Sequence, residues 1–258
     1  MSLLLVRCLC NFGGNSGLIL YLLCWYSFGL VGVMLMRVIF PLVFVLVVFR
    51  GFAQSPDTVM DRYKPTVGSL VVGGVMVGYG FAALKWQPLV SFDHDLRFDR
   101  PHARVRVDDY LQYAPALTVY VLNAAGVKGK HDLRDRTVIY IMANAVLGAA
   151  VLGLKHVISA ERPDGSGDDG FPSGHSATAF AAAEFLRQEY QGRSVWYGIA
   201  GYTAAVGTSF FRVYNDKHWF SEVVAGAGIG WLAAKTAYWV WPVVGRKVFG
   251  KKRDKFVE

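Results

Sequence analysis

Three short stretches in the second half of the sequence hold most of the polar residues whose types and spacing could do chemistry. The stretches are Lys155–Pro163, Phe171–His175 and Arg212–Glu222, and the first of them includes Arg162. Each contains a cation, a histidine or a helix-starting serine, which a plain apolar helix would not need. What they could do depends on whether the fold brings them together.

Cations recur in the first and third stretches. Lys155, Arg162 and Arg212 are costly to crowd together unless an anion lies between them. A phosphoryl group is the natural occupant, because arginine offers its oxygens a two-pronged hydrogen-bonding fork. Ser173 and Gly174 open a predicted helix, where backbone N–H groups and the positive end of the helix dipole bind phosphate. These five residues form the predicted phosphate cradle.

Two histidines could act on such a phosphoryl group. His218 and Glu222 are four residues apart, hence on one face of a helix. A carboxylate that accepts the Nδ1–H of a histidine fixes its tautomer and leaves Nε2 free to attack phosphorus. His175 would then protonate the leaving oxygen. The pattern predicts phosphoryl transfer through a histidine nucleophile, with cations in place of a metal neutralising the charge of the transition state.

Six largely apolar segments must position these stretches: Gly68–Leu84, Leu111–Val127, Thr137–Leu154, Ser173–Leu186, Val195–Phe211 and Trp219–Trp241. Several reach about 17–20 residues, near the length that crosses a bilayer, and their small residues permit close helix packing. Because successive helices alternate in direction, the three stretches meet on one face. The predicted fold is all-α: a polytopic helical membrane bundle with a six-helix core.

Composition supports a membrane protein and excludes other classes. The 258 residues are 53% hydrophobic, with a mean hydropathy of +0.32, and only 18% are charged, against roughly 25% in soluble domains. All three cysteines precede residue 25, which excludes a disulfide framework or a thiolate metal site in the main body. The residues after Pro242 supply four of the eight net positive charges, as a juxtamembrane anchor would and a nucleic-acid groove would not.

The N-terminal region allows two interpretations. Met36-Arg37, an apolar stretch of 12 residues and Gly51-Phe52-Ala53 are typical of a secretory signal peptide, and residues 1–35 would then be an upstream extension. The alternative is an uncleaved transmembrane anchor. We divide the chain into an N-terminal apolar region (1–54), a helical domain (55–242) and a basic tail (243–258).

Charge asymmetry predicts the orientation. If all six segments span, 14 lysines and arginines lie on the side opposite the three stretches and nine on the same side. The positive-inside rule then places the protein in the inner membrane with its site facing the periplasm, if the source is a Gram-negative bacterium. A cleaved signal peptide conflicts with this orientation, because six crossings would turn the site inward.

The motifs K-x6-RP, PSGH and R-x5-H-x3-E, in this order over Lys155–Glu222, resemble those of the type 2 phosphatidic acid phosphatase and vanadium haloperoxidase superfamily. The six-segment frame resembles its membrane branch. The resemblance implies a phosphohistidine intermediate on His218, with Glu222 orienting it and His175 as general acid. It also implies that no metal or cofactor is needed and that the substrate is a phosphorylated lipid: phosphatidic acid, phosphatidylglycerophosphate, an isoprenyl diphosphate or lipid A.

Two positions depart from the family pattern. Glu222 stands where the family usually has aspartate, and Phe211 stands where a serine commonly precedes the third-motif arginine. Three alternatives stay open: a soluble periplasmic acid phosphatase of the same superfamily, a vanadate-dependent haloperoxidase, and a non-catalytic membrane protein that binds phosphorylated lipid. The oligomeric state stays open as well.

Two sets of polar residues outside the motifs are predicted to be solvated. Lys85–Tyr110 is predicted to be a solvated loop of mixed charge on the side of the site, with a lid or a headgroup contact as the alternative. His94, His102 and His131 are predicted to be surface residues without partners.

Overall fold

The computed structural model describes residues 67–97 and 103–249; the predicted N-terminal region 1–54 and most of the basic tail lie outside these ranges. The described residues form eight α-helices: α3 (Val67–Ala83), α4 (Gln87–Asp95), α5 (Val107–Leu111), α6 (Ala114–Ala124), α7 (Leu133–Val157), α8 (Gly174–Tyr190), α9 (Val195–Tyr214) and α10 (Phe220–Phe249). Among the described residues the sole β-type pairing is an isolated bridge between Ala160 and Asp169, in the loop between α7 and α8. The all-α prediction is confirmed for this part of the chain.

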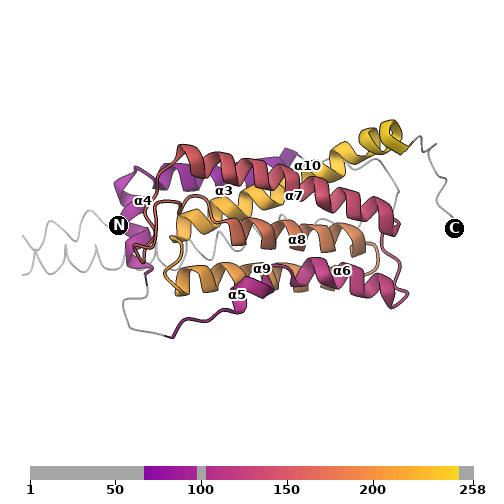
Figure 1. Cartoon of the computed structure of the whole chain (residues 1–258), viewed down its shortest axis with the longest axis horizontal. Helices are drawn as coiled ribbons and strands as arrows, with labels where there is room; N and C mark the ends of the chain where they lie inside the picture. The colour runs from indigo at the N-terminus through magenta and orange to yellow at the C-terminus, as the bar shows by residue number, and fades with distance from the viewer. Residues whose placement is uncertain (1–66, 98–102, 250–258) are drawn as a thin grey trace, which may run out of the picture. The chain divides into compact units, whose positions relative to one another are not determined.

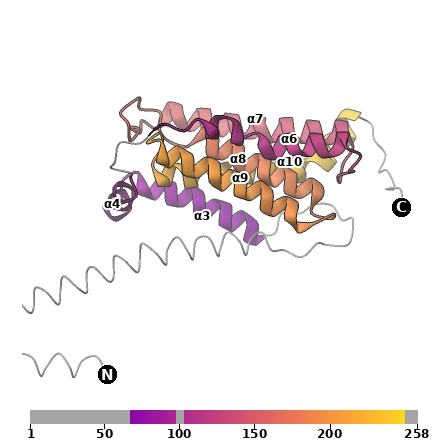
Figure 2. The same ribbon diagram turned by 90° about the horizontal axis from the view of Figure 1, so that it is seen from below.

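Helix α8 occupies the centre of the helical domain. It contacts α5, α6, α7, α9 and α10, and the two views of Figures 1 and 2 show it enclosed by neighbouring helices. Thirteen of its 17 residues are buried, many of them alanines, which let the surrounding helices approach closely. The start of α8 is therefore held in place from several sides.

Small residues do permit the close packing that the sequence predicts. Gly226 of α10 faces the first turn of α8, and a Cβ there would collide with the carbonyl oxygen of Ser173. A side chain at this position would push the two helices apart. The N-terminal halves of α8 and α10 consequently lie against each other, and both carry residues of the predicted site.

One helix of the described residues is long and apolar enough to cross a membrane. Helix α7 has 25 residues, its most apolar window has a mean hydropathy of 2.0, and only 22% of that window is buried. Its exposed apolar side chains include Ile141, Leu152 and Val157. Helices α3 and α4 pass the same test only as a pair bent by 93°. This criterion supports fewer spans than the six apolar segments suggested.

The structure corrects the predicted element boundaries in three places. The second segment, Leu111–Val127, is shortened to α6, which begins at Ala114 with Pro115 in its first turn, while Leu111 ends α5. The predicted loop Lys85–Tyr110 contains α4 and the start of α5, with Pro88 in the first turn of α4. Helix α10 continues through Pro242 to Phe249, so the predicted boundary between the helical domain and the basic tail falls inside a helix.

Candidate active site

The three motif stretches meet in the structure. The first covers the last turn of α7 and the loop after it, the second leads into the start of α8, and the third joins α9 to α10. Backbone hydrogen bonds connect them: Ser173 N–H donates to the carbonyl of Glu222 (3.1 Å), and Asp164 N–H donates to that of Asp216 (3.1 Å). The indole N–H of Trp219 donates to the carbonyl of Glu161 (2.9 Å). The positioning of the site is therefore a property of the loops as well as of the helices.

His218 and Glu222 form a buried pair. Nδ1 of His218 lies 2.9 Å from Oε2 of Glu222, and both side chains are 2% exposed. The same oxygen accepts the backbone N–H of Trp219 at 3.1 Å. A Cβ at Gly170 would collide with the Glu222 carboxylate, so the loop before α8 covers this carboxylate at backbone distance. Burial raises the pKa of Glu222 to about 8. In its ionised form this carboxylate accepts the proton of Nδ1 and leaves Nε2 unprotonated.

The environment keeps His218 neutral. Burial is the largest effect, followed by the positive charges of the three cradle cations (Arg212, Lys155 and Arg162) and of His175; together they hold the pKa of His218 well below its ordinary value of 6.5. Because a neutral imidazole has a lone pair, this shift preserves a nucleophile at neutral and mildly acidic pH. It also places the cradle cations within electrostatic reach of His218.

Two of the cradle cations hold a carboxylate of the same chain. Arg162 donates from Nε (2.8 Å) and Nη2 (3.0 Å) to the two oxygens of Asp169, and Lys155 donates to the Asp169 carbonyl. The hydrogen bond from Arg162 lowers the pKa of Asp169. Asp169 is 56% exposed, so an incoming anion could replace its carboxylate without unfolding the loop.

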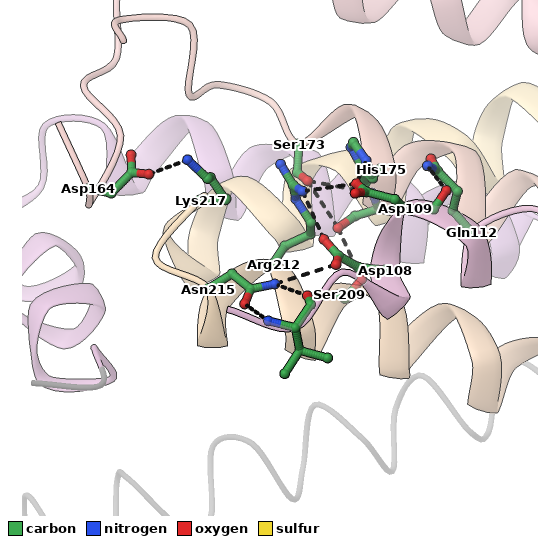
Figure 3. A network of polar contacts seen from close by, with 12 residues as sticks. Asp108, Asp109, Gln112, Asp164, Ser173, His175, Ser209, Arg212, Asn215 and Lys217 are labelled. Carbon is green, nitrogen blue, oxygen red and sulfur yellow. Dashed lines mark hydrogen bonds and ion pairs between the residues drawn. The ribbon is translucent and has the colours of Figure 1, made fainter. Parts of the chain in front are cut away.

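The third cradle cation is fixed differently. Arg212 donates from Nη1 to Oδ2 of Asp108 at 2.8 Å, and both side chains are almost fully buried. The Nε of Arg212 is also buried, and it has no hydrogen-bond partner among the described residues. Figure 3 shows this guanidinium between Asp108, Asp109 and the start of α8. An unpaired buried donor is costly unless a ligand completes it, and a phosphate oxygen is a suitable acceptor.

The start of α8 is organised by hydroxyl groups. Ser173 caps the helix by accepting from Ser176 N–H, and Ser176 donates to Ser173 at 3.1 Å. Ser209 donates in turn to Ser176, also at 3.1 Å. Ser209 precedes Arg212 by three residues and so supplies a buried hydroxyl next to the cradle, on the helix where Phe211 replaces the usual serine. Gly174 follows the cap as the first residue of α8.

His175 faces an acidic partner that the sequence analysis missed. Its Nε2 lies 3.1 Å from Oδ1 of Asp109, which belongs to α5. Asp108 and Asp109 lie 104 and 66 residues before their partners Arg212 and His175. They belong to the segment predicted to be a solvated loop and to no motif, so no local pattern identified them. That prediction is wrong for α5, and also for Asp93 of α4, which is buried and accepts hydrogen bonds from the backbone and the hydroxyl of Ser221.

Two of the three histidines predicted to be surface residues without partners do have partners, contrary to that prediction. His131 Nδ1 lies 2.7 Å from Oε1 of Glu189, and the ring of His94 packs on that of Trp219 with centroids 4.5 Å apart. His102 lies outside the described residues. The partner of His131 is 58 residues away in sequence, which is why spacing gave no signal.

One cluster of the described part of the chain has the composition of a metal site. Asp108, Asp109 and His175 place one potential ligand atom each within 4.8 Å of one another. Asp108 is committed to Arg212, however, and a cation beside this guanidinium would be repelled. The donor set therefore fits a metal poorly.

The structure thus holds an oriented, neutral histidine near three cations, at one end of an all-helical domain. Such an arrangement can bind a phosphoryl group and attack it. Comparison with known families agrees with this class. Residues 136–246 match the PAP2 superfamily. The matched region contains the three motif stretches and does not include α5.

A curated protein with similarity to the chain is a lipid A 1-phosphatase of Porphyromonas gingivalis. The two are 34% identical over 146 residues, which cover 56% of this chain but only 33% of that protein. The chain thus matches about a third of the length of this relative. A crystal structure of a transmembrane PAP2-type phosphatidylglycerolphosphate phosphatase from Bacillus subtilis aligns with 86% of this chain at 18% identity, with a TM-score of 0.34, which is too low to establish a shared fold.

Proposed function

We propose that the protein is a metal-independent lipid phosphatase that works through a phosphohistidine. The observation that carries the proposal is the buried His218–Glu222 contact of 2.9 Å. It lies near the three cradle cations, whose positive charges a bound anion would neutralise. The match of residues 136–246 to the PAP2 superfamily supports it. A protein that merely bound phosphorylated lipid would need the cations but not a buried histidine oriented by a carboxylate.

The reaction takes place in two displacements. The substrate phosphate binds the cradle and replaces the Asp169 carboxylate. Nε2 of His218 attacks phosphorus, the bond from phosphorus to the lipid oxygen breaks, and His175 donates a proton to that oxygen. A water molecule then attacks the phosphohistidine, and His175 takes a proton from this water. The bond from phosphorus to Nε2 breaks, which releases inorganic phosphate and restores neutral His218. The cradle cations neutralise the equatorial oxygens in both transition states.

Among lipid phosphates, we propose the 1-phosphate of lipid A as the first substrate to test. The support is the similarity to the lipid A 1-phosphatase, which is 34% identical over the region that contains the site. Phosphatidic acid, phosphatidylglycerophosphate and isoprenyl diphosphates share the phosphoryl group that the cradle would bind. The headgroup must be chosen outside the cradle, by the segments around α4 and α5.

We also propose that the protein resides in a membrane, with the site at one membrane surface. Helix α7, with its long apolar and largely unburied face, supports this location. The positive-inside rule favours the inner membrane and a site that faces the periplasm. As part of this proposal we keep the division of the chain at residues 54 and 242. The choice between a signal peptide and an anchor for the N-terminal region stays open.

The test is phosphate release by the purified protein in detergent and EDTA, with lipid A and the three other lipid phosphates as substrates. The wild type releases phosphate and His218→Ala does not, and the panel ranks the substrates. A silent wild type that still binds lipid phosphate would contradict the proposal and would make the protein a binding protein. Activity that disappears with EDTA would contradict the metal-independent mechanism.

A further inference from the structure

The acidic helix α5 lies against the proposed site although it precedes the region that matches the superfamily. Its Asp108 holds Arg212 at 2.8 Å, and its Asp109 holds His175 at 3.1 Å. Figure 3 shows both aspartates directed at these two partners. Neither aspartate belongs to the three motif stretches, and the two differ in exposure: 2% for Asp108 and 42% for Asp109.

From this juxtaposition we infer that Asp109 is a positioning residue for His175, which it holds in the orientation and protonation state of a general acid. The inference rests on the proposed function. It gives the site two histidine–carboxylate pairs with opposite tasks. Glu222 accepts from Nδ1 of His218 and leaves its Nε2 as a nucleophile, whereas Asp109 accepts from Nε2 of His175 and stabilises the imidazolium that must give up a proton.

The position of Asp109 is fixed by the rest of α5. The side chain of Asn215 forms two hydrogen bonds with the backbone of Val105, donating to its carbonyl (2.7 Å) and accepting its N–H (3.0 Å). Asn215 follows α9 directly, so this clamp attaches the approach to α5 to the third motif. With the buried Asp108–Arg212 pair as a second attachment, α5 has little freedom to move, and Asp109 stays within reach of His175.

Electrostatics requires such a partner. The charged and titratable groups that face His175 are Arg212 from α9, Asp108 and Asp109 from α5, and His218 from the loop before α10. Burial and then Arg212 lower the pKa of His175 below its ordinary value, and Asp108 is already neutralised by Arg212. Asp109 is left as the carboxylate that can offset the charge of a protonated His175.

The test compares two substrates in wild type, Asp109→Asn and Asp109→Glu. General acid catalysis matters for a lipid alkoxide, which leaves poorly, and little for p-nitrophenolate, which leaves without a proton. Asp109→Asn should lower kcat/KM, which reports the steps up to departure of the leaving group, by about 10–100-fold on the lipid phosphate and by less than about threefold on p-nitrophenyl phosphate. Its alkaline limb of kcat/KM should move to lower pH, and Asp109→Glu should recover part of the loss.

Asp168→Asn serves as the control, because it removes the same charge from an exposed position at the rim of the site and should leave the ratio between the two substrates unchanged. Equal losses on both substrates, or a gain in activity, in Asp109→Asn would overturn the inference while the proposed function stands. A wild type that releases phosphate from neither substrate would overturn both.

Discussion

The two halves of α8 hold carboxylates in opposite ways. In the later half, Glu184 and Glu189 are fully buried. At the start of α8, by contrast, the carboxylates that contact His175 and Arg162, namely Asp109 and Asp169, are 42% and 56% exposed. The same central helix thus carries one closed ionic network and one that solvent and ligands can enter.

The closed network satisfies its carboxylates completely. Glu184 accepts two hydrogen bonds of 2.8 Å from Arg187 and one of 2.8 Å from Gln188, and it pairs with Lys235 at 3.0 Å. Tyr202 donates to it as well. Such a buried network fixes how helices pack but offers no room for a ligand.

The open network is built for exchange. Its cations are held by side chains of the same chain, and one buried donor, Nε of Arg212, has no partner among residues 67–97 and 103–249. The closed network also holds such a donor, Nη1 of Arg136, but there the carboxylates are fully buried. An anion that replaced Asp169 would gain the fork of Arg162 and the Nε donor of Arg212 together. The comparison indicates that the ionic groups of the later half of α8 stabilise the fold, while those at its start are open to the ligand of the proposed function. Four changes test this division.

The largest effect is expected at the oriented histidine. Glu222→Gln keeps the volume of the side chain but no longer selects the Nδ1–H tautomer, so kcat should fall by about 10⁴-fold, as when the orienting carboxylate of a catalytic triad becomes an amide. Glu222→Asp, which restores the residue usual in the family, should retain part of the activity. Steady-state kinetics on the lipid phosphate measures both, and a loss below tenfold in Glu222→Gln would contradict an orienting role.

The next effect concerns the closed network. Glu184→Gln leaves Arg187 and Lys235 buried with less negative charge, which should destabilise the protein by about 3–5 kcal/mol. Denaturant unfolding in detergent measures this change. At a temperature where the variant remains folded, its kcat should stay within about twofold of the wild type. A stable but inactive Glu184→Gln would show that the two halves of α8 do not have separate tasks.

A smaller effect is expected at the exchangeable carboxylate. Asp169→Asn removes the anion that competes with the substrate phosphate for Arg162 and Lys155, and it should lower KM by up to about fivefold, since a half-exposed ion pair is worth at most about 1 kcal/mol. The matched control is Asp168→Asn, which removes the neighbouring charge and should leave KM unchanged. If KM rises in Asp169→Asn alone, Asp169 helps to hold the cradle and does not compete with substrate.

The smallest expected effect is a shift in the pKa of His218. The pKa of His218 is lowered by burial and by the cradle cations, so folding disfavours its protonated form, and the residue should remain neutral when the pH falls through 6.5. An NMR pH titration of histidine-labelled protein, with His218→Gln to assign the signal, measures this directly. A midpoint at or above 6.5 would mean that the cations do not act on His218 and would remove the reason for placing them around it.

The sequence was sufficient where the spacing is local or repeated. His218 and Glu222 are one helical turn apart, so their contact follows from helix geometry. The meeting of Lys155, Ser173 and Arg212 follows from the alternating directions of apolar helices. These features need no knowledge of side-chain packing, and the structure places all of them where the pattern predicts.

The remainder depends on contacts between distant segments. Asp108 reaches Arg212 across 104 positions of sequence, and Asp109 reaches His175 across 66. In a stretch of mixed charge these aspartates look the same as solvated ones. The short helices α4 and α5 likewise depend on packing against α3 and α9, since a helix of five to nine residues is not stable alone.

The most direct measurement for the central claim is the trapping of the intermediate. Wild-type protein is mixed in EDTA with lipid phosphate carrying ³²P, quenched in base within milliseconds, and analysed for label on histidine. We expect acid-labile, base-stable label on His218, none in His218→Ala, and loss of the label when excess unlabelled lipid phosphate is added before the quench. Turnover without labelled histidine in the wild type, or label that persists in His218→Ala, would contradict a phosphohistidine on His218.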